Sequence, residues 1–287
     1  MIQRVNEKRL IQLVCELTKR TRDEIEQTGL KPDDFLGIAD KYDVALYWEE
    51  LPLDNPGYYS KDECKIVLNN RIKNQERLNF TFYHELTHHL IEHNDEILTL
   101  LADAYISSDY ETMERLCNAG AAELLMPSED VRQLMLEKGF STTLIPELCE
   151  RFGASSIAVA FQMVNCASHD CYLVIAENQI VKPMAVHNQT PLLNIKPTDV
   201  PQEQLVIIYS GASPAAKYSI KCNQTILGNH LLCTALHANE PVRGDARLPF
   251  ASGNGWNVPC EAFYFRGKVF AFFNRTQPIS RLQMPLF

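Results

Sequence analysis

The stretch FYHELTHHLIEH, residues 82–93, places four histidines and two glutamates within twelve residues. On an α-helix, His84 and His88 lie four residues apart on one face, so both imidazoles can bind one ion. Glu85 is offset from them by about a quarter-turn, and its carboxylate can reach a water on that ion without being a ligand. This is the logic of the HExxH motif, in which two histidines hold Zn²⁺ and the glutamate accepts a proton as water attacks a carbonyl.

The other residues of this stretch define the rest of the helix. Its apolar side is supplied by Phe82, Leu86 and Leu90. We expect His89 and His93 to be exposed or to support the ligands, because a catalytic zinc keeps one coordination position open. A metzincin pattern is excluded, since Ile91 and Asn94 stand where that pattern has glycine and histidine.

A third protein ligand is expected in ETMERLCNAGAAELLMP, residues 111–127. Glu114 is the best candidate, although Asp109 and Glu111 are rivals on spacing alone. Glu114 and Asn118 are four residues apart and share a helix face, from which Asn118 can hydrogen-bond a liganding histidine. The small residues GAA that follow would let this helix pack closely against the HExxH helix.

HELTHH, followed by ERLCNAGAAELLMP, resembles the ImmA/IrrE family of metallopeptidases. That family pairs HExxH with a downstream Glu-x-x-x-Asn segment leading into a Leu-Met-Pro ending, and CKIVLNN and RLNFTFYHE are similar to its strand and helix entry. The resemblance covers roughly residues 5–165. It implies a gluzincin-like site with Glu85 as the base and with three metal ligands, His84, His88 and Glu114. Gly120 departs from the family's bulky aromatic residue, which affects packing more than chemistry.

The resemblance implies a zinc-dependent endopeptidase of narrow specificity that cleaves a helix-turn-helix transcriptional repressor and so releases stress-response or mobile-element genes. Zn²⁺ is the chemical default for a His₂Glu site, and Mn²⁺ or another divalent ion is the alternative. The rival hypothesis is a non-proteolytic regulatory protein with a structural metal, which has no need of Glu85. Tyr58, Tyr59 and histidines of the carboxy-terminal part are unranked candidates for stabilising the oxyanion.

Composition narrows the function classes further. The formal net charge of −9 works against binding to nucleic acid, so direct DNA binding is not expected. The partner that the resemblance implies is a protein substrate, the DNA-binding repressor. No apolar run approaches the roughly 18 residues that span a bilayer, and the amino terminus lacks a signal-peptide pattern, so we expect a cytoplasmic protein without a membrane partner. An acidic run from Glu92 to Glu114 should lie near the cleft and favour a basic substrate segment.

The predicted fold class is α+β, in three parts. We expect a zincin-like metallopeptidase domain at residues 1–127 and a helical, helix-turn-helix-like module at 128–166. A β-rich, mixed α/β, GAF-like sensor domain follows at 167–287, where CYLVIAE, QIVKPMAV, QLVIIYS and KVFAFFNR read as strands. The GAF-like assignment rests on the architecture of the radiation-response branch of the family. RGDARLPFASGNGW, residues 243–256, is a candidate ligand-facing loop.

The helical module has the spacing of a DNA-binding motif but not its chemistry. TLIPELCERFGASSIAVAFQMV contains a helix, a glycine turn and a second helix. A recognition helix offers Arg, Lys, Asn or Gln to bases and phosphates, whereas residues 155–164 offer only Gln162. We therefore predict that this helix is buried by packing rather than used to contact DNA.

Overall fold

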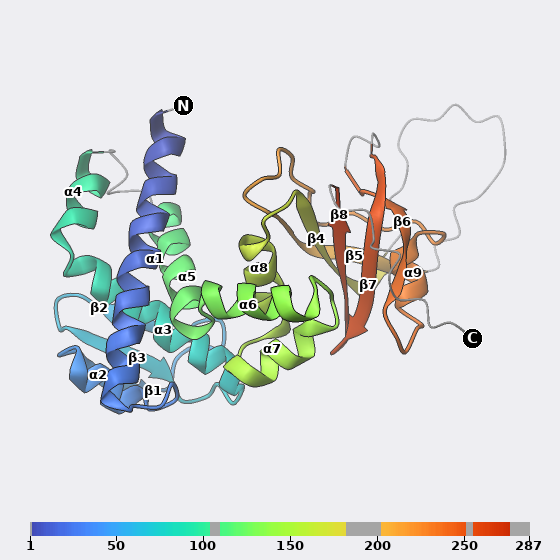
Figure 1. Ribbon diagram of the computed structural model, residues 1–287. Coiled ribbons are helices and arrows are strands. Elements are labelled where there is room, and N and C mark those ends of the chain that lie inside the picture. The colour runs from blue at the N-terminus through green and yellow to red at the C-terminus, as the bar shows by residue number, and fades with distance from the viewer. Residues whose placement is uncertain (1, 104–109, 182–201, 251–254, 276–287) are drawn as a thin grey trace, which may run out of the picture. The chain divides into compact units, whose positions relative to one another are not determined.

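The computed structural model describes the chain apart from residues 1, 104–109, 182–201, 251–254 and 276–287 (Figure 1). The chain divides into two compact units. One consists of Met1–Gln133 and Glu147–Gln162, and the other of Leu134–Pro146 and Met163–Phe287. In the described part of the chain, no helix has both the length and the apolar character needed to cross a membrane.

The first unit contains a three-stranded sheet with the strand order β1-β3-β2. Strand β1 (Ala45–Glu49) runs parallel to β3 (Lys65–Asn69), and β2 (Gly57–Ser60) runs antiparallel to β3. The central strand has the apolar sequence of a covered strand, and Ile66 and Val67 are fully buried. Because β2 stands last in the strand order, it is an edge strand, and its outer edge pairs with no other strand among the described residues.

Five helices accompany this sheet: α1 (Ile2–Thr28), α2 (Phe35–Lys41), α3 (Gln75–Glu92), α4 (Asp95–Asp103) and α5 (Tyr110–Leu125). The HExxH segment lies on α3, which follows β3 after a short loop as its sequence predicts. Helix α3 begins after Asn74, whose side chain accepts a hydrogen bond from the backbone N–H of Arg77 at 2.8 Å. Helices α1, α3 and α5 pack together and bury their apolar faces (Figure 1).

A close approach between α3 and α5 depends on one glycine. A Cβ atom on Gly120 would lie 2.5 Å from Cγ2 of Thr87 on α3 and 3.0 Å from Cγ1 of Val14 on α1. Thr87 is fully buried, and its hydroxyl donates to the backbone carbonyl of Tyr83 at 2.7 Å, so its side chain is fixed. The expectation that small residues let these two helices pack closely is confirmed.

Three shorter helices follow: α6 (Ser128–Lys138), α7 (Leu144–Phe152) and α8 (Ser156–Cys166). Gly153, with a φ of 58°, forms the turn between α7 and α8. Gln162 is buried, and its amide donates to the carbonyl of Met126 at 2.9 Å. Its polar group is thus used within the fold, as the apolar sequence of this helix predicts, and the helix-turn-helix-like assignment stays a prediction.

The second unit contains a five-stranded antiparallel sheet with the order β5-β4-β8-β7-β6. Its strands are β4 (Cys171–Val181), β5 (Gln202–Ala212), β6 (Val242–Arg247), β7 (Asn257–Phe265) and β8 (Lys268–Asn274). The short helix α9 (Leu231–Ala235) packs against β6, β7 and β8. The first half of β4 (residues 171–176) and the middle of β8 (residues 269–273) are continuous in buried residues, which agrees with the β-rich composition of this part of the sequence.

Two predictions for this unit need correction. The segment QIVKPMAV does not form a separate strand at its start, because residues 179–181 continue β4; the remainder lies outside the described residues. The candidate loop at 243–256 is in part a strand, since residues 243–247 belong to β6 and pair with β7. Residues 251–254 of that loop lie outside the described part of the chain.

Candidate metal centre

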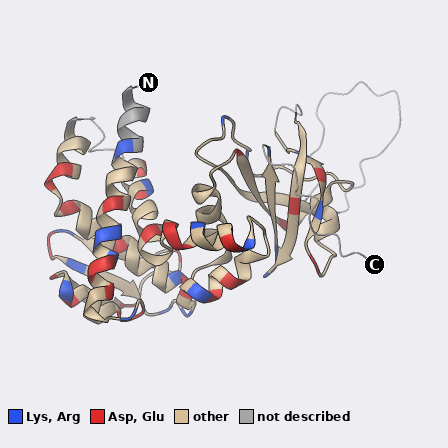
Figure 2. Ribbon diagram, viewed as in Figure 1, with Lys and Arg blue, Asp and Glu red and all other residues tan. Residues whose placement is uncertain are grey.

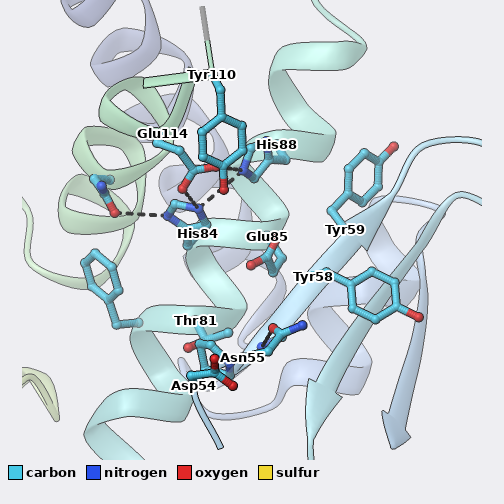
Figure 3. A pocket seen from close by; sticks show the side chains of 14 residues that line it. Asp54, Asn55, Tyr58, Tyr59, Thr81, His84, Glu85, His88, Tyr110 and Glu114 are labelled. Atoms are coloured by element: carbon cyan, nitrogen blue, oxygen red, sulfur yellow. Dashed lines mark hydrogen bonds and ion pairs between the residues drawn. The ribbon is translucent and has the colours of Figure 1, made fainter. Parts of the chain in front are cut away.

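The first unit contains a cavity of about 610 Å³ whose walls come from three elements (Figure 3). Helix α3 contributes one wall, helix α5 a second, and strand β2 with the loop before it a third. The side chains that carry chemistry are His84, Glu85 and His88 from α3, and Tyr110, Glu114 and Asn118 from α5. Residues far apart in the sequence thus meet because α3 and α5 pack closely.

Three residues in this cavity have side-chain atoms with the spacing of metal ligands. Nε2 of His84 lies 3.3 Å from Nε2 of His88 and 3.3 Å from Oε2 of Glu114, and Nε2 of His88 lies 3.5 Å from Oε1 of Glu114. Two atoms that each lie at about 2.05 Å from a tetrahedral Zn²⁺ are about 3.3 Å apart. These residues therefore fit a divalent ion, by chemistry and by separation.

Asn118 fixes the orientation of one imidazole. Its amide oxygen lies 3.1 Å from Nδ1 of His84 and accepts a hydrogen bond from that nitrogen (Figure 3). Nε2 of His84 is then left with its lone pair directed at Glu114 and His88. This contact matches the supporting role that the shared helix face of Glu114 and Asn118 predicts for Asn118.

Burial prepares both histidines to act as ligands. It lowers the pKa of His84, which the Glu114 carboxylate partly offsets. Burial, reinforced by the neighbouring His84, lowers the pKa of His88 to about 4. Both imidazoles are thus neutral at neutral pH, which is the state that binds a metal ion.

Glu85 lies beside the two histidines and points into the same cavity (Figure 3). A carboxylate oxygen of Glu85 and a nitrogen of each histidine lie within 4.8 Å of one another. Burial raises the pKa of Glu85 to about 7, against the opposing effect of a hydrogen bond from the backbone N–H of Tyr59. A carboxylate with a pKa near neutrality is suited to accept a proton and then release it.

The rival third ligands do not occupy this position. Glu111 is exposed and does not line the cavity, whereas Asp109 lies outside the described residues. Acidic and basic side chains both occur on the helices of the first unit (Figure 2). Of the acidic residues from Glu92 to Glu114 with described side chains, Glu114 lines the cavity, and the charge of Glu92 acts on His88. That this acidic run favours a basic substrate segment stays a prediction.

The expectation for His89 is wrong as well. His89 is 5% exposed. Among the described residues, it forms no hydrogen bond with His84, His88 or Glu114. Its Nε2–H donates to the carbonyl of Tyr42 at 2.9 Å, and His89 does not line the cavity. His93 is exposed, as expected. Neither histidine completes a closed set of four ligands with His84 and His88.

Two features of the cavity were not anticipated. Tyr110 lies one helical turn before Glu114, whose negative charge, together with a hydrogen bond to the hydroxyl, raises the pKa of Tyr110. Both side chains line the cavity (Figure 3). The i, i+4 spacing in YETME is the signal that would have identified Tyr110.

Asn69, fully buried, donates through its amide to the carbonyls of Leu51, Pro52 and Asn55 at 2.8 to 3.1 Å, and so holds the loop before β2.

In the first unit, a carboxylate from a second helix thus lies beside the two histidines of the HExxH stretch, in the arrangement that the sequence predicts for a metallopeptidase. Residues 47–163 match Peptidase_M78, the IrrE N-terminal-like domain. The chain is 27% identical over 218 residues to the radiation response metalloprotease IrrE of Deinococcus deserti, with 76% of this chain and 73% of that protein covered. It is 25% identical over 209 residues to the protein of the same name from Deinococcus radiodurans, with 72% and 62% covered.

A solved structure supports the fold alone. A transcriptional regulator of Mycobacterium tuberculosis superimposes with a TM-score of 0.54 at 14% identity, over 90% of this chain and 76% of that one. Together, the family match and the two relatives confirm the resemblance to the ImmA/IrrE family and support a metallopeptidase.

Proposed function

We propose that this protein is a zinc-dependent endopeptidase of narrow specificity, active in the cytoplasm, that cleaves a helix-turn-helix transcriptional repressor. The observation that carries the proposal is the triangle of ligand atoms from His84, His88 and Glu114, with separations of 3.3 to 3.5 Å, beside the buried carboxylate of Glu85. A structural metal site would not need that carboxylate.

In this proposal, His84, His88 and Glu114 hold the ion, and Asn118 keeps His84 in the tautomer that presents Nε2. A divalent ion supplies Lewis-acid chemistry, polarising the scissile carbonyl and activating water as a nucleophile. Glu85 accepts a proton from that water and delivers it to the leaving amine, which its raised pKa favours.

The hydroxyl of Tyr110 is our candidate for stabilising the oxyanion. It is the phenol that bonds to Glu114 at the cavity mouth. Tyr59 is less suitable, because its hydroxyl lies 3.2 Å from Nδ1 of His89, a residue that does not line the cavity. Glu114 raises the pKa of Tyr110, so the phenol keeps its proton and remains a donor at neutral pH.

The choice of ion and substrate rests on chemistry and on the family resemblance. A set of two imidazoles and one carboxylate suits Zn²⁺ best, with Mn²⁺ as the alternative. The relatives' name, radiation response metalloprotease, supports a role in stress response. We also propose that the second unit is a GAF-like sensor domain. Its five-stranded antiparallel sheet with a helix on one face supports this proposal.

The test is cleavage of the repressor encoded beside this gene, with added Zn²⁺ or Mn²⁺, by wild type, Glu85→Gln and Glu111→Gln. The Glu85 variant keeps the shape of the side chain but removes the base, whereas Glu111 is an exposed acid outside the cavity. We expect cleavage to be lost in Glu85→Gln at unchanged ion content and retained in Glu111→Gln. Equal cleavage by all three proteins would reject the assignment of Glu85, and binding without cleavage would favour the non-proteolytic alternative.

A further inference from the structure

A second group of ligand-type side chains lies at the C-terminal end of α3, and none of its three residues lines the cavity. Cys64 directly precedes β3, while His89 and His93 are one turn apart at the end of α3. One ligand atom from each of these three residues lies within 4.8 Å of the others. None of the three takes part in the centre formed by His84 and His88.

The separations suit a tetrahedral ion. Sγ of Cys64 lies 3.8 Å from Nδ1 of His89. A thiolate at about 2.3 Å and an imidazole nitrogen at about 2.05 Å from a tetrahedral Zn²⁺ are about 3.6 Å apart. The sulfur and the nitrogen therefore need to move by only a few tenths of an ångström to share an ion.

Both histidines are oriented by backbone carbonyls in the way that metal-binding histidines are. Nε2–H of His89 donates to the carbonyl of Tyr42 at 2.9 Å, which leaves the lone pair of Nδ1 facing the thiol. Nδ1–H of His93 donates to the carbonyl of His89 at 2.8 Å, which leaves Nε2 available. Each ring thus offers one nitrogen and has the other already fixed.

The backbone conformation of Cys64 also determines where its thiol lies. Cys64 has a φ of 47°, a left-handed conformation that is unfavourable for a residue with a Cβ. This conformation ends the turn before β3 and directs the side chain towards α3, where Sγ lies 3.4 Å from the carbonyl of Asp43. A glycine would adopt this backbone at less cost, so the cysteine stands at a position that disfavours a side chain.

We propose that Cys64, His89 and His93 form a second metal site, separate from the peptidase centre, which takes Zn²⁺ or an ion of similar softness. The thiolate and two imidazoles select Zn²⁺ or Cu⁺ over Mg²⁺ or Ca²⁺, which require oxygen ligands. The nearby carboxylates of Asp43 and Glu92 add negative charge, although Glu92 is paired with Lys61.

One residue touches both sites. The hydroxyl of Tyr59 lies 3.2 Å from Nδ1 of His89, the nitrogen that an ion would bind, and the backbone N–H of the same residue bonds to Glu85. Binding of an ion to His89 would remove the hydrogen-bond acceptor of that hydroxyl. Tyr59 therefore offers a physical connection between the second site and the carboxylate in the cavity.

Titration with Co²⁺ distinguishes the two sites, because the peptidase centre contains no sulfur. A thiolate bound to Co²⁺ gives a charge-transfer absorption in the near ultraviolet. We expect the wild-type chain to bind two equivalents of Co²⁺ and to show this absorption. Cys64→Ser should bind one equivalent without the band, and Cys222→Ser, which changes an exposed cysteine elsewhere, should behave as wild type.

A second variant guards against misfolding. His93 is exposed, so His93→Gln should fold normally, and it should weaken binding at the thiolate site by at least about 10- to 100-fold while the other equivalent is unchanged. Binding of a single equivalent by the wild type without the band, or a band that persists in Cys64→Ser, would overturn the proposal. The readouts do not depend on peptidase activity, so a failure here leaves the proposed function intact.

Discussion

Replacing Gly120 by alanine should weaken metal binding, although Gly120 touches no ligand. The added Cβ would lie 2.5 Å from Cγ2 of Thr87, whereas ordinary contacts begin at 3.4 Å, so α3 and α5 must separate by up to about 0.9 Å at this point. Thr87 cannot rotate away without losing its hydrogen bond to Tyr83. Glu114 lies on the same helix as Gly120 and moves with it.

The magnitude follows from how little a metal site tolerates. Ligand distances in a functional site lie within about 0.2 Å of ideal, so a displacement several times larger separates Glu114 from the two histidines. We expect the affinity for Zn²⁺ to fall by at least about tenfold. The metal-free variant should also lose about 1–3 kcal/mol of stability through overpacking, partly offset by about 1 kcal/mol because alanine is the better helix former.

The assay is competition for Zn²⁺ with a chromophoric chelator, together with denaturant unfolding of the metal-free protein. Thr87→Ser removes the clashing methyl group, so the double variant should recover most of the lost affinity, and the double-mutant cycle measures that coupling. Ala122→Gly is the control, since it changes helix propensity on α5 but should leave the affinity unchanged. Wild-type affinity in Gly120→Ala would refute the idea that this contact positions Glu114.

Four further predictions concern the same site. In metal-free protein, Glu85→Gln should stabilise the fold by about 3 kcal/mol near pH 8 and have little effect near pH 4, measured by denaturant unfolding. Burial raises the pKa of Glu85 from 4.5 to about 7, so between these pH values the native state binds more protons than the unfolded state. The wild type therefore loses stability as the pH rises through this range. A stability difference between wild type and Glu85→Gln that does not change with pH would contradict this. Asn118→Ala should reduce Zn²⁺ affinity about 10- to 100-fold, whereas Asn118→Asp, which keeps the acceptor, should retain most of it. Tyr110→Phe should lower kcat by about 100-fold with the ion still bound, and an unchanged kcat would remove the tyrosine from the mechanism. In a Cys64→Ser background, which removes the second site, zinc at about 100 times its Kd should stabilise the protein by about 2.7 kcal/mol over chelator-treated protein, an increment that Glu114→Gln should abolish in a thermal melt.

Local pattern predicted the elements of the first unit well, because helix periodicity, the strand CKIVLN and the HExxH spacing are all contained in short stretches. The approach of Glu114 to the histidines followed from the family resemblance, because spacing alone left Asp109 and Glu111 as rivals. What local pattern could not provide was the environment of His89. Its burial is decided by the carbonyl of Tyr42 and the thiol of Cys64, which only the tertiary fold brings to that face of α3.

Tyr110 and the strand assignment at 179–181 illustrate the same limit. The sequence contains the i, i+4 relation between Tyr110 and Glu114, but a tyrosine at a helix start is usually a surface residue. Only the tertiary fold shows that this tyrosine lines the cavity beside the candidate metal ligands. Residues 179–181 continue β4 because they pair with β5, and such pairing between distant segments is not visible in a local pattern.

Strand β2 borders the cavity with Gly57, Tyr58 and Tyr59, and it is an edge strand of its sheet. Backbone groups on such an edge can pair with an extended peptide, but they cannot pair with a residue inside a helix. A bond that is presented this way must lie in a linker or in a segment that opens transiently. The cleavage rate would then follow the local opening equilibrium of the substrate. A substrate mutation that destabilises this segment would therefore increase the rate of cleavage, although the peptidase itself is unchanged.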